Sequence, residues 1–340
     1  MMNLLEKYCK IAAVSGDEYR LRNAIIEDIK DYADSIEIDP LGSIIVFKKG
    51  EKRAKRKVML DAHMDEIGLI ITSVTEQGYL RFDTVGGIDN KVLFGKRVKI
   101  RDVSGVIGGC AVHLLDSADK DKVQPYDKLF IDIGASSREQ ALEYVDIGET
   151  AVFDTGFELI GKKIAARALD DRIGCAVLVD MIQKPLEYDM WFTFTVQEEV
   201  GCRGAKCAAF AVDPDFAFVI ESTTAADLHD VPPDKVVCVL GQGAAVSFMD
   251  NGTLYDREMY NFVLENCRKN DIAIQLKTAA KGGNNASAVH LSRKGVRTCA
   301  LSLPCRYIHS QYCVAHKTDV TALQNAVKCA AQLVAGGALE

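Results

Sequence analysis

From residue 162 onward, apolar segments of strand length alternate with segments of helical period, and this pattern constrains the fold more than any other. Strands are predicted at 190–196, 216–220, 272–276 and 298–303, and helices at 171–182, 203–212, 255–270, 287–295 and 318–334. Residues 1–67 add a helix that begins near residue 19 and strands at 43–47 and 57–60. Such alternation predicts an α/β fold with a central sheet flanked by helices.

Residues 68–161 have a different texture. Short β-rich segments such as "GLIITSV", "YLRFDTVGG", "KRVKIR" and "KLFIDIG" are separated by glycines, and one helical segment, "SSREQALEYV", interrupts them. This pattern is typical of a small β-barrel or β-sandwich. We therefore expect one α/β domain, residues 1–67 and 162–340, with a β domain inserted at residues 68–161.

Three local signals predict finer structure. "SGDE" at 15–18 fits a capping box for the helix that follows. The basic run "KKGEKRAKRK" at 48–57 lies between two apolar strands and is expected at a solvated hairpin tip. Thr318 is the expected N-cap of the last helix.

Composition excludes several classes of protein. The chain has 340 residues, is 48% hydrophobic, and has a formal net charge of −7, which argues against nucleic-acid or membrane-surface binding. No apolar run approaches the length that spans a bilayer. The eleven cysteines include no C-x-x-C pair and lie mostly in apolar segments, so we expect a cytoplasmic, reducing location without disulfides.

Residues able to bind metal follow or precede the apolar segments at five places. These places are His63 with Asp65, Asp170 with Asp171, Glu198 with Glu199, Glu221, and His309. Ligands of open α/β sheets bind at the carboxyl ends of the strands, so residues distant in sequence can converge there. Asp61 and Glu66 flank the first place; we expect Asp61 to support the strand end and Glu66 to lie at the rim.

Two histidines with a surplus of carboxylates suit divalent zinc, cobalt or manganese. A carboxylate can bridge two such ions, and a Glu that is not a ligand can act as the general base toward water. Each residue also has an ordinary structural explanation: Asp-Asp before a helix is commonly a cap, and Glu-Glu in a loop is commonly solvated. The residues alone do not decide which member of each adjacent pair is the ligand.

The motifs "DAHMDEIG", "ARALDDRIG", "VQEEVGCRGA" and "PCRYIHS" occur in order over nearly the whole chain. Together they resemble the tetrahedral, glutamyl-aminopeptidase-like dinuclear metallopeptidases. "NKVLFGKRVKI" and "GFELIGKK" resemble parts of that family's inserted β domain and its edge. The resemblance implies a zinc-peptidase-like sheet, an inserted domain concerned with oligomerisation or substrate access, and a dodecamer built from dimers.

The resemblance also implies a role for each matching residue. His63, Asp170, Glu199, Glu221 and His309 would bind two divalent metal ions, with Asp170 bridging them. Of the two remaining carboxylates, Asp65 would orient the His63 imidazole and Glu198 would be the general base.

This chain departs from the family pattern at two places. Glu221 stands where many members have Asp, and Asp227 is the reserve candidate for that ligand. The segment with Asn284 and Asn285 stands where the family often reads Gly-Gly-Thr-Asp-Ala, so a negative charge expected near the site is missing. This loss affects the expected substrate preference and catalytic efficiency.

The resulting functional prediction is a metallo-aminopeptidase that removes N-terminal residues from peptide substrates. The alternatives are a metal-dependent deacylase of small metabolites, a metal-independent glycoside hydrolase with two carboxylates, and a non-catalytic oligomeric scaffold. Sensitivity to chelators and assays of acylated metabolites against peptides discriminate among the enzymes.

Overall fold

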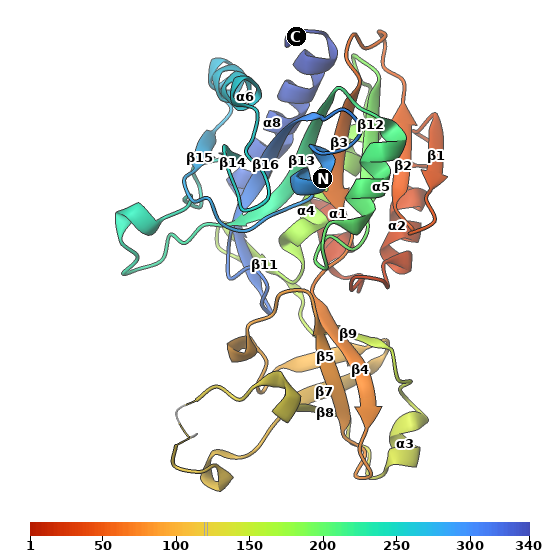
Figure 1. Cartoon of the computed structure of the whole chain (residues 1–340), viewed down its shortest axis with the longest axis vertical. Coiled ribbons are helices and arrows are strands. Elements are labelled where there is room, and N and C mark those ends of the chain that lie inside the picture. The colour runs from red at the N-terminus through yellow and green to blue at the C-terminus, as the bar shows by residue number, and fades with distance from the viewer. Residues whose placement is uncertain (119, 121) are drawn as a thin grey trace.

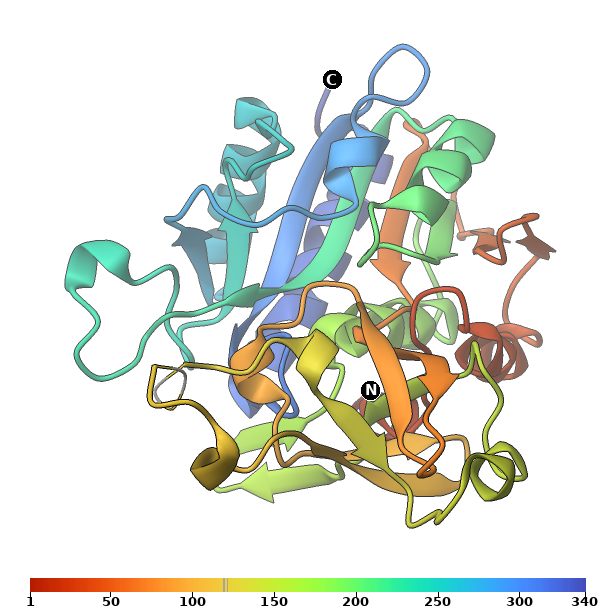
Figure 2. The same cartoon turned by 60° about the horizontal axis from the view of Figure 1, so that its bottom comes forward.

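The computed structural model describes residues 1–118, 120 and 122–340. It contains a large mixed sheet covered by helices and a separate closed β-barrel, drawn in the upper and lower halves of Figure 1. The barrel lies beyond the end of the sheet at which β3 finishes and the chain enters β4 (Figures 1 and 2). This arrangement confirms the predicted α/β fold with an inserted β-barrel.

The large sheet has a parallel centre and antiparallel flanks. The neighbouring strands of its main path are, in order, β1 (Ser35–Ile38), β2 (Ile44–Lys48), β12 (Met190–Thr195), β3 (Val58–His63), β13 (Phe216–Thr224), β16 (Arg297–Arg306), β17 (Cys313–His316), β11 (Lys163–Ala166) and β10 (Phe157–Ile160). A branch leaves this path at β16, which pairs with β14 (Ala244–Ser247), and β14 in turn pairs with β15 (Ile274–Lys277). Strands β12, β3, β13 and β16 are mutually parallel. Both faces of these strands are covered, which explains their nearly continuous apolar sequences.

Alternate residues of the central strands enter two different cores. One face packs against α1 (Met2–Cys9), α2 (Tyr19–Ile29), α4 (Leu169–Ile182), α6 (Arg257–Lys269) and α8 (Lys317–Ala335). The other face packs against the smaller α5 (Arg203–Val212) and α7 (Ala286–Val289). In β3, Leu60 belongs to the first core and Met59 to the second. The period of two therefore places His63 on the α5 and α7 side, together with Asp61.

The barrel has its own apolar core. Its strands close in the order β4 (Gly68–Val74), β5 (Leu80–Val85), β8 (Phe130–Asp132), β7 (Val103–Gly108), β6 (Arg97–Ile100) and β9 (Thr150–Phe153). Leu69, Leu80 and Ile131 are among the buried residues of this core. The short helix α3 (Arg138–Leu142) begins after Ser137, whose hydroxyl accepts a hydrogen bond from the Gln140 amide. The remaining short helices are 3₁₀ turns at Asn90–Val92, Val112–Leu114, Tyr126–Lys128 and Pro233–Lys235.

Several local predictions were wrong. Ser15 does not cap α2, because its hydroxyl donates to Asp65 instead. The segment at 48–57 is not a hairpin tip, because β12 lies between β2 and β3. Helix α8 is capped by His316, whose Nδ1 accepts from the Thr318 amide. The helix predicted at 287–295 ends at Val289 and continues as turns.

No helix in the described part of the chain is both long enough and apolar enough to cross a membrane. The cysteines are all free thiols.

Candidate metal centre

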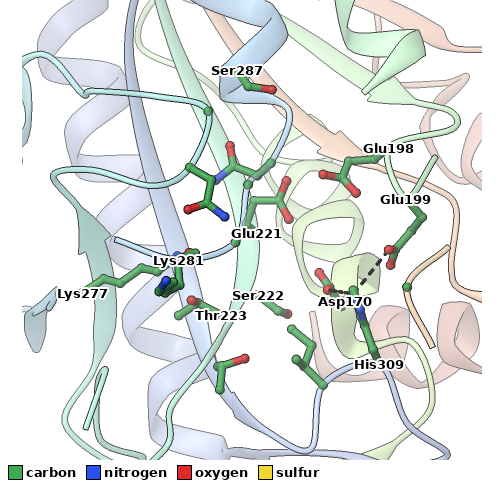
Figure 3. A pocket seen from close by; sticks show the side chains of 18 of the residues that line it. Asp170, Glu198, Glu199, Glu221, Ser222, Thr223, Lys277, Lys281, Ser287 and His309 are labelled. Carbon is green, nitrogen blue, oxygen red and sulfur yellow. Dashed lines mark hydrogen bonds and ion pairs between the residues drawn. The ribbon is translucent and has the colours of Figure 1, made fainter. Parts of the chain in front are cut away.

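The sequence-predicted residues meet at the carboxyl ends of the central parallel strands. His63 is the last residue of β3, Glu198 and Glu199 follow β12, and Glu221 lies within β13. His309 comes from the segment after β16. Together with Asp170 they line a cavity of about 720 Å³, and Figure 3 shows Asp170, Glu198, Glu199, Glu221 and His309 around it. The loop after β5 in the barrel contributes Gly87 to the wall of this cavity.

Asp170 lies between the two histidines. Its Oδ1 is 3.6 Å from Nε2 of His63, and its Oδ2 is 3.5 Å from Nε2 of His309. Each histidine has one further carboxylate: Glu221 Oε2 is 3.5 Å from His63 Nε2, and Glu199 Oε2 is 3.3 Å from His309 Nε2. The donor atoms thus form two groups that share Asp170. The dashed lines in Figure 3 mark the group around His309.

Asp171 also lies close enough to His63 and Glu221 to complete a three-residue donor group. Its oxygens, however, are already used: Oδ2 accepts from the His63 amide at 3.3 Å and Oδ1 from the Gly174 amide at 2.9 Å. Asp170 Oδ1, in contrast, is buried without a hydrogen-bond partner. The geometry therefore favours Asp170 over Asp171 as the donor that faces both histidines. The peptide bond between the two aspartates is cis.

The donor set fits divalent metal ions. Among the described residues, Asp170 Oδ1 and Glu221 Oε1 are buried oxygens that accept no hydrogen bond, which is costly unless a cation or donor faces them. Burial raises the pKa of Glu221 to about 7, and the nearby carboxylates Asp170 and Asp61 add to this rise, while His63 opposes it. Imidazole nitrogens combined with carboxylate oxygens are the ligands of zinc, cobalt and manganese, and such an ion would neutralise the crowded carboxylates.

Asp65 contacts both His63 and the Glu198–Glu199 segment. Its Oδ1 is 3.4 Å from Nδ1 of His63, and its backbone carbonyl is 3.1 Å from the same nitrogen. Its carboxylate also accepts the amides of Glu198 at 2.9 Å and Glu199 at 3.0 Å, and the hydroxyl of Ser15 at 2.6 Å. Burial opposes ionisation, but His63 and these donors hold the pKa of Asp65 below its usual value.

Glu198 differs from the other carboxylates that line the cavity. Within the described part of the chain it forms no ion pair with a histidine, and its polar side-chain contact is a 3.7 Å approach of the Cys202 thiol to Oε1. Burial, together with the neighbouring Glu221 and Glu199, raises its pKa well above the ordinary value. Glu198 therefore lines the cavity with a carboxylate that neither histidine engages.

The flanking acids behave differently from one another. Asp61 supports the strand end as expected, because it accepts hydrogen bonds from Thr193 at 2.5 Å and Asn285 at 2.8 Å. Glu66 is not at an exposed rim. It is buried and paired with Arg167 at 2.6 Å and Arg172 at 2.9 Å.

The structure also corrects two expectations that came from the departures from the family pattern, one for Asp227 and one for Asn285. Asp227 is not a reserve ligand, because its carboxylate pairs with Arg306 at 2.7 Å. Asn285 does not line the cavity. Its side chain is fully buried and donates to Asp61 and to Thr195, each at 2.8 Å, while Asn284 is the member of the pair that lines the cavity.

Sequence reasoning missed Arg172, which is fully buried directly after the aspartate pair. Its guanidinium donates to the carbonyl oxygens of Tyr8, Met64 and Ile11 as well as to Glu66. It therefore binds the backbone beside His63 to the N-terminal segment. An arginine inside the otherwise apolar helical run "RIGCAVLV" was the available signal, because an arginine is rarely buried without partners.

Two histidines that share a carboxylate at the carboxyl ends of a mixed sheet form a site that suits a metal-dependent hydrolase. Residues 42–325 match the family model of the M42 glutamyl aminopeptidases. A putative aminopeptidase from Acetivibrio thermocellus is 40% identical over 330 residues, which is 96% of each chain. A lysyl aminopeptidase from Pyrococcus furiosus is 33% identical over 342 residues, covering 97% of this chain and 96% of that protein.

Solved structures agree with this result. The TET1 peptidase of Pyrococcus horikoshii, described as able to assemble into a tetrahedron or a large octahedral shell, superposes with a TM-score of 0.84. It is 39% identical, and the match covers 97% of this chain and 98% of that one. The chain belongs to the M42 glutamyl aminopeptidase family.

The protein is therefore a metal-dependent aminopeptidase, a hydrolase of peptide bonds. The family and enzyme class predicted from the motifs are confirmed. The comparisons favour none of the alternatives: deacylase, glycoside hydrolase or scaffold.

Proposed function

We propose that this aminopeptidase works with two divalent ions, of zinc, cobalt or manganese. His63 and Glu221 would hold one ion, His309 and Glu199 the other, and Asp170 would bridge them. The observation that carries this proposal is the position of Asp170, whose two oxygens face the two histidines at 3.6 and 3.5 Å. A single carboxylate with one oxygen toward each histidine could serve both ions, because the metals of two-metal hydrolytic sites lie only about 3.5–4 Å apart.

Glu198 is the proposed general base. When bound, the metal ions polarise the carbonyl of the scissile bond and make water at the site more acidic. Glu198 removes a proton from the water while the oxygen of that water forms a bond to the carbonyl carbon. It then delivers that proton to the leaving nitrogen as the carbon–nitrogen bond breaks, so the carboxylate is regenerated. Its carboxylate lines the cavity without pairing with either histidine, which leaves it available for both halves of this transfer.

Asp65 is the proposed positioning residue. By accepting both amides of the Glu198–Glu199 segment and facing Nδ1 of His63, it fixes the tautomer of the imidazole and the place of the base at once. Loss of this carboxylate would loosen donors of both metal groups.

The two parts of the chain have different proposed tasks. Residues 1–67 and 162–340 would form the catalytic part, and residues 68–161 would serve oligomerisation and substrate access. Gly87 in the cavity wall supports a role in access. Exposed apolar side chains such as Leu114, which is 70% exposed, support a role in assembly. A homologous solved structure that is described as a dodecamer supports the same assembly for this chain, which would be built from dimers. The eleven free thiols suit a reducing cytoplasm.

The decisive test is a metal-reconstitution assay. Metal-stripped protein is refilled with zinc, cobalt or manganese and assayed against a panel of chromogenic aminoacyl substrates, with N-acetylated versions as controls. We expect activity to rise to a plateau at two ions per chain and the blocked substrates to be inert. A plateau at one ion, or equal cleavage of blocked substrates, would contradict the proposal.

A further inference from the structure

The segment "SGDE" at 15–18 connects the barrel to the sheet part of the molecule. Ser15 donates to Asp65 at the metal centre, while the Asp17 carboxylate accepts a hydrogen bond from the hydroxyl of Thr150 in β9 at 2.6 Å. The barrel and the sheet have separate apolar cores, and the strands of the barrel pack mainly on one another. The bond between Asp17 and Thr150 is therefore a specific link between two parts that share little packing.

Glu18 links the same segment to the residue that precedes the proposed general base. It is only 5% exposed, and its Oε1 accepts the amide of Gly16 at 2.9 Å and the amide of Gln197 at 3.1 Å. Gln197 is the neighbour of Glu198 and has a φ of +58°, a left-handed conformation that is costly for a residue other than glycine. Such a conformation persists only where surrounding bonds hold it, and Glu18 supplies one of these bonds.

A role in stability alone explains only part of this arrangement. A carboxylate that accepts backbone amides stabilises a turn wherever it occurs, as Asp39 does for the amides of residues 41–43 between β1 and β2. In the segment 15–18, however, the side chains contact three different parts of the molecule: Asp65, the barrel and Gln197. Two of these contacts lie directly against the proposed catalytic machinery.

The bond between Asp17 and Thr150 lies where it can open. Both residues line a cavity of about 880 Å³, together with Ser15 and Gly16. Of the described residues, none lines both this cavity and the one at the metal centre. Water in the cavity competes for the carboxylate and the hydroxyl, so the bond can break without disrupting either apolar core.

We propose that the segment 15–18 couples the position of the barrel to the position of the general base, with Glu18 as a positioning residue for Glu198. The inference rests on the proposed function, because it takes Glu198 as the base. While the bond to the barrel is closed, the turn is fixed and Glu18 keeps Gln197 in its left-handed conformation. When the barrel moves away and this bond breaks, the turn loosens and the segment that carries the base loses its anchor.

Amide hydrogen exchange tests the coupling directly, on both metal-stripped and metal-loaded protein. Thr150→Val removes the hydroxyl and nearly preserves the size of the side chain. We expect the amides of residues 197–199 to exchange at least about threefold faster than in the wild type. Thr75→Val, which removes a hydroxyl from a turn of the barrel, is the matched control and should leave these amides unchanged. Unchanged exchange at 197–199 in Thr150→Val overturns the inference.

A double-mutant cycle tests whether Asp17 and Thr150 act as one link. Asp17→Ala is expected to accelerate exchange at 197–199 as Thr150→Val does, and the double variant should be no faster than either single variant. Asp17→Asn keeps an acceptor oxygen and should behave as wild type. Additive effects in the double variant would refute the link. Both residues are partly exposed, so these variants remain informative if a substitution of the buried Glu18 prevents folding.

Kinetics of metal-loaded enzyme test the positioning role of Glu18. In Glu18→Ala we expect kcat to fall about 10- to 100-fold while KM stays within about threefold, because a displaced base slows the chemical step more than it weakens binding. Glu18→Gln retains an oxygen that can accept both amides and should restore most of kcat. Asp39→Ala, which also removes a carboxylate from backbone amides, should keep the wild-type kcat.

The remaining outcomes separate this inference from the proposed function. A loss of activity in Glu18→Ala that matches the loss of folded protein, or an equal loss in Asp39→Ala, reduces Glu18 to a role in stability and overturns its positioning role. Faster exchange at 197–199 with an unchanged kcat does the same. If the wild type turns over no aminoacyl substrate, the proposed function is wrong, and the exchange measurements still decide the coupling.

Discussion

At the residue scale, Asn285 shows how a departure from a family pattern is compensated. A carboxylate at this position would face the buried Asp61, whose pKa burial already raises to about 6. The amide of Asn285 instead donates to both Asp61 and Thr195. The asparagine therefore affects the packing of the strands beneath the site and not the wall of the cavity, because Asn285 is absent from the cavity lining.

Asn285→Asp is expected to destabilise the protein by about 2–4 kcal/mol, since it replaces a buried donor with a second carboxyl group opposite Asp61. Adding Asp61→Asn restores one donor and one acceptor, and we expect the double variant to recover most of the loss. Urea unfolding of the two single variants and the double variant measures this coupling. The exposed Asn23→Asp on α2 is the control and should stay within about 0.5 kcal/mol of wild type. Additive losses in the double variant would contradict the pairing.

At the scale of elements, the loop before α2 and the loop after β3 support each other. Ser15 donates to Asp65, the Glu66 amide donates to the Ala13 carbonyl, and the Ala13 amide donates to the Glu66 side chain. These bonds connect the N-terminal segment to the residues directly after His63. The organisation of the site therefore depends on a segment that contributes no proposed ligand.

Ser15→Ala removes one of the donors that hold the Asp65 carboxylate. We expect a loss of about 1 kcal/mol in stability and a several-fold fall in kcat/KM, because the Glu198–Glu199 segment loses part of its anchor. The Ser15→Thr variant keeps the hydroxyl and should restore activity. Kinetics and calorimetry of both variants check this expectation. If Ser15→Ala lowers activity only as far as it lowers the folded fraction, Ser15 acts on stability alone.

The sequence predicted these elements unequally well. The strand at 190–196 and the helix at 203–212 match β12 and α5 closely, because their apolar periods agree with their burial. The strand at 216–220 begins with β13 but ends too early, because β13 continues through the polar residues from Glu221 to Thr224. The capping box failed because the Ser15 hydroxyl has a tertiary partner fifty residues away. Local sequence does not contain that partner, and it does not reveal that β12 separates β2 from β3.

At the scale of the whole molecule, the cores on the two faces of the sheet and the core of the barrel are separate clusters. The barrel loop with Gly87 reaches the polar cavity that the sheet strands form. The motifs sufficed to predict that the five donor residues converge, since parallel strands end at one edge. They did not show which aspartate of the pair faces both histidines, because that depends on which oxygens the backbone amides already occupy.

The central claim is that two metal ions share Asp170 while Glu198 moves the proton, and the Glu198→Gln variant tests it most directly. The measurement is kcat on an aminoacyl substrate together with the metal content of the same sample by elemental analysis. We predict two ions per chain, as in the wild type, with kcat lower by about 10²- to 10⁴-fold. Near wild-type turnover with full metal content, or loss of metal from the variant, would contradict the assignment of Glu198 as a base that is not a ligand.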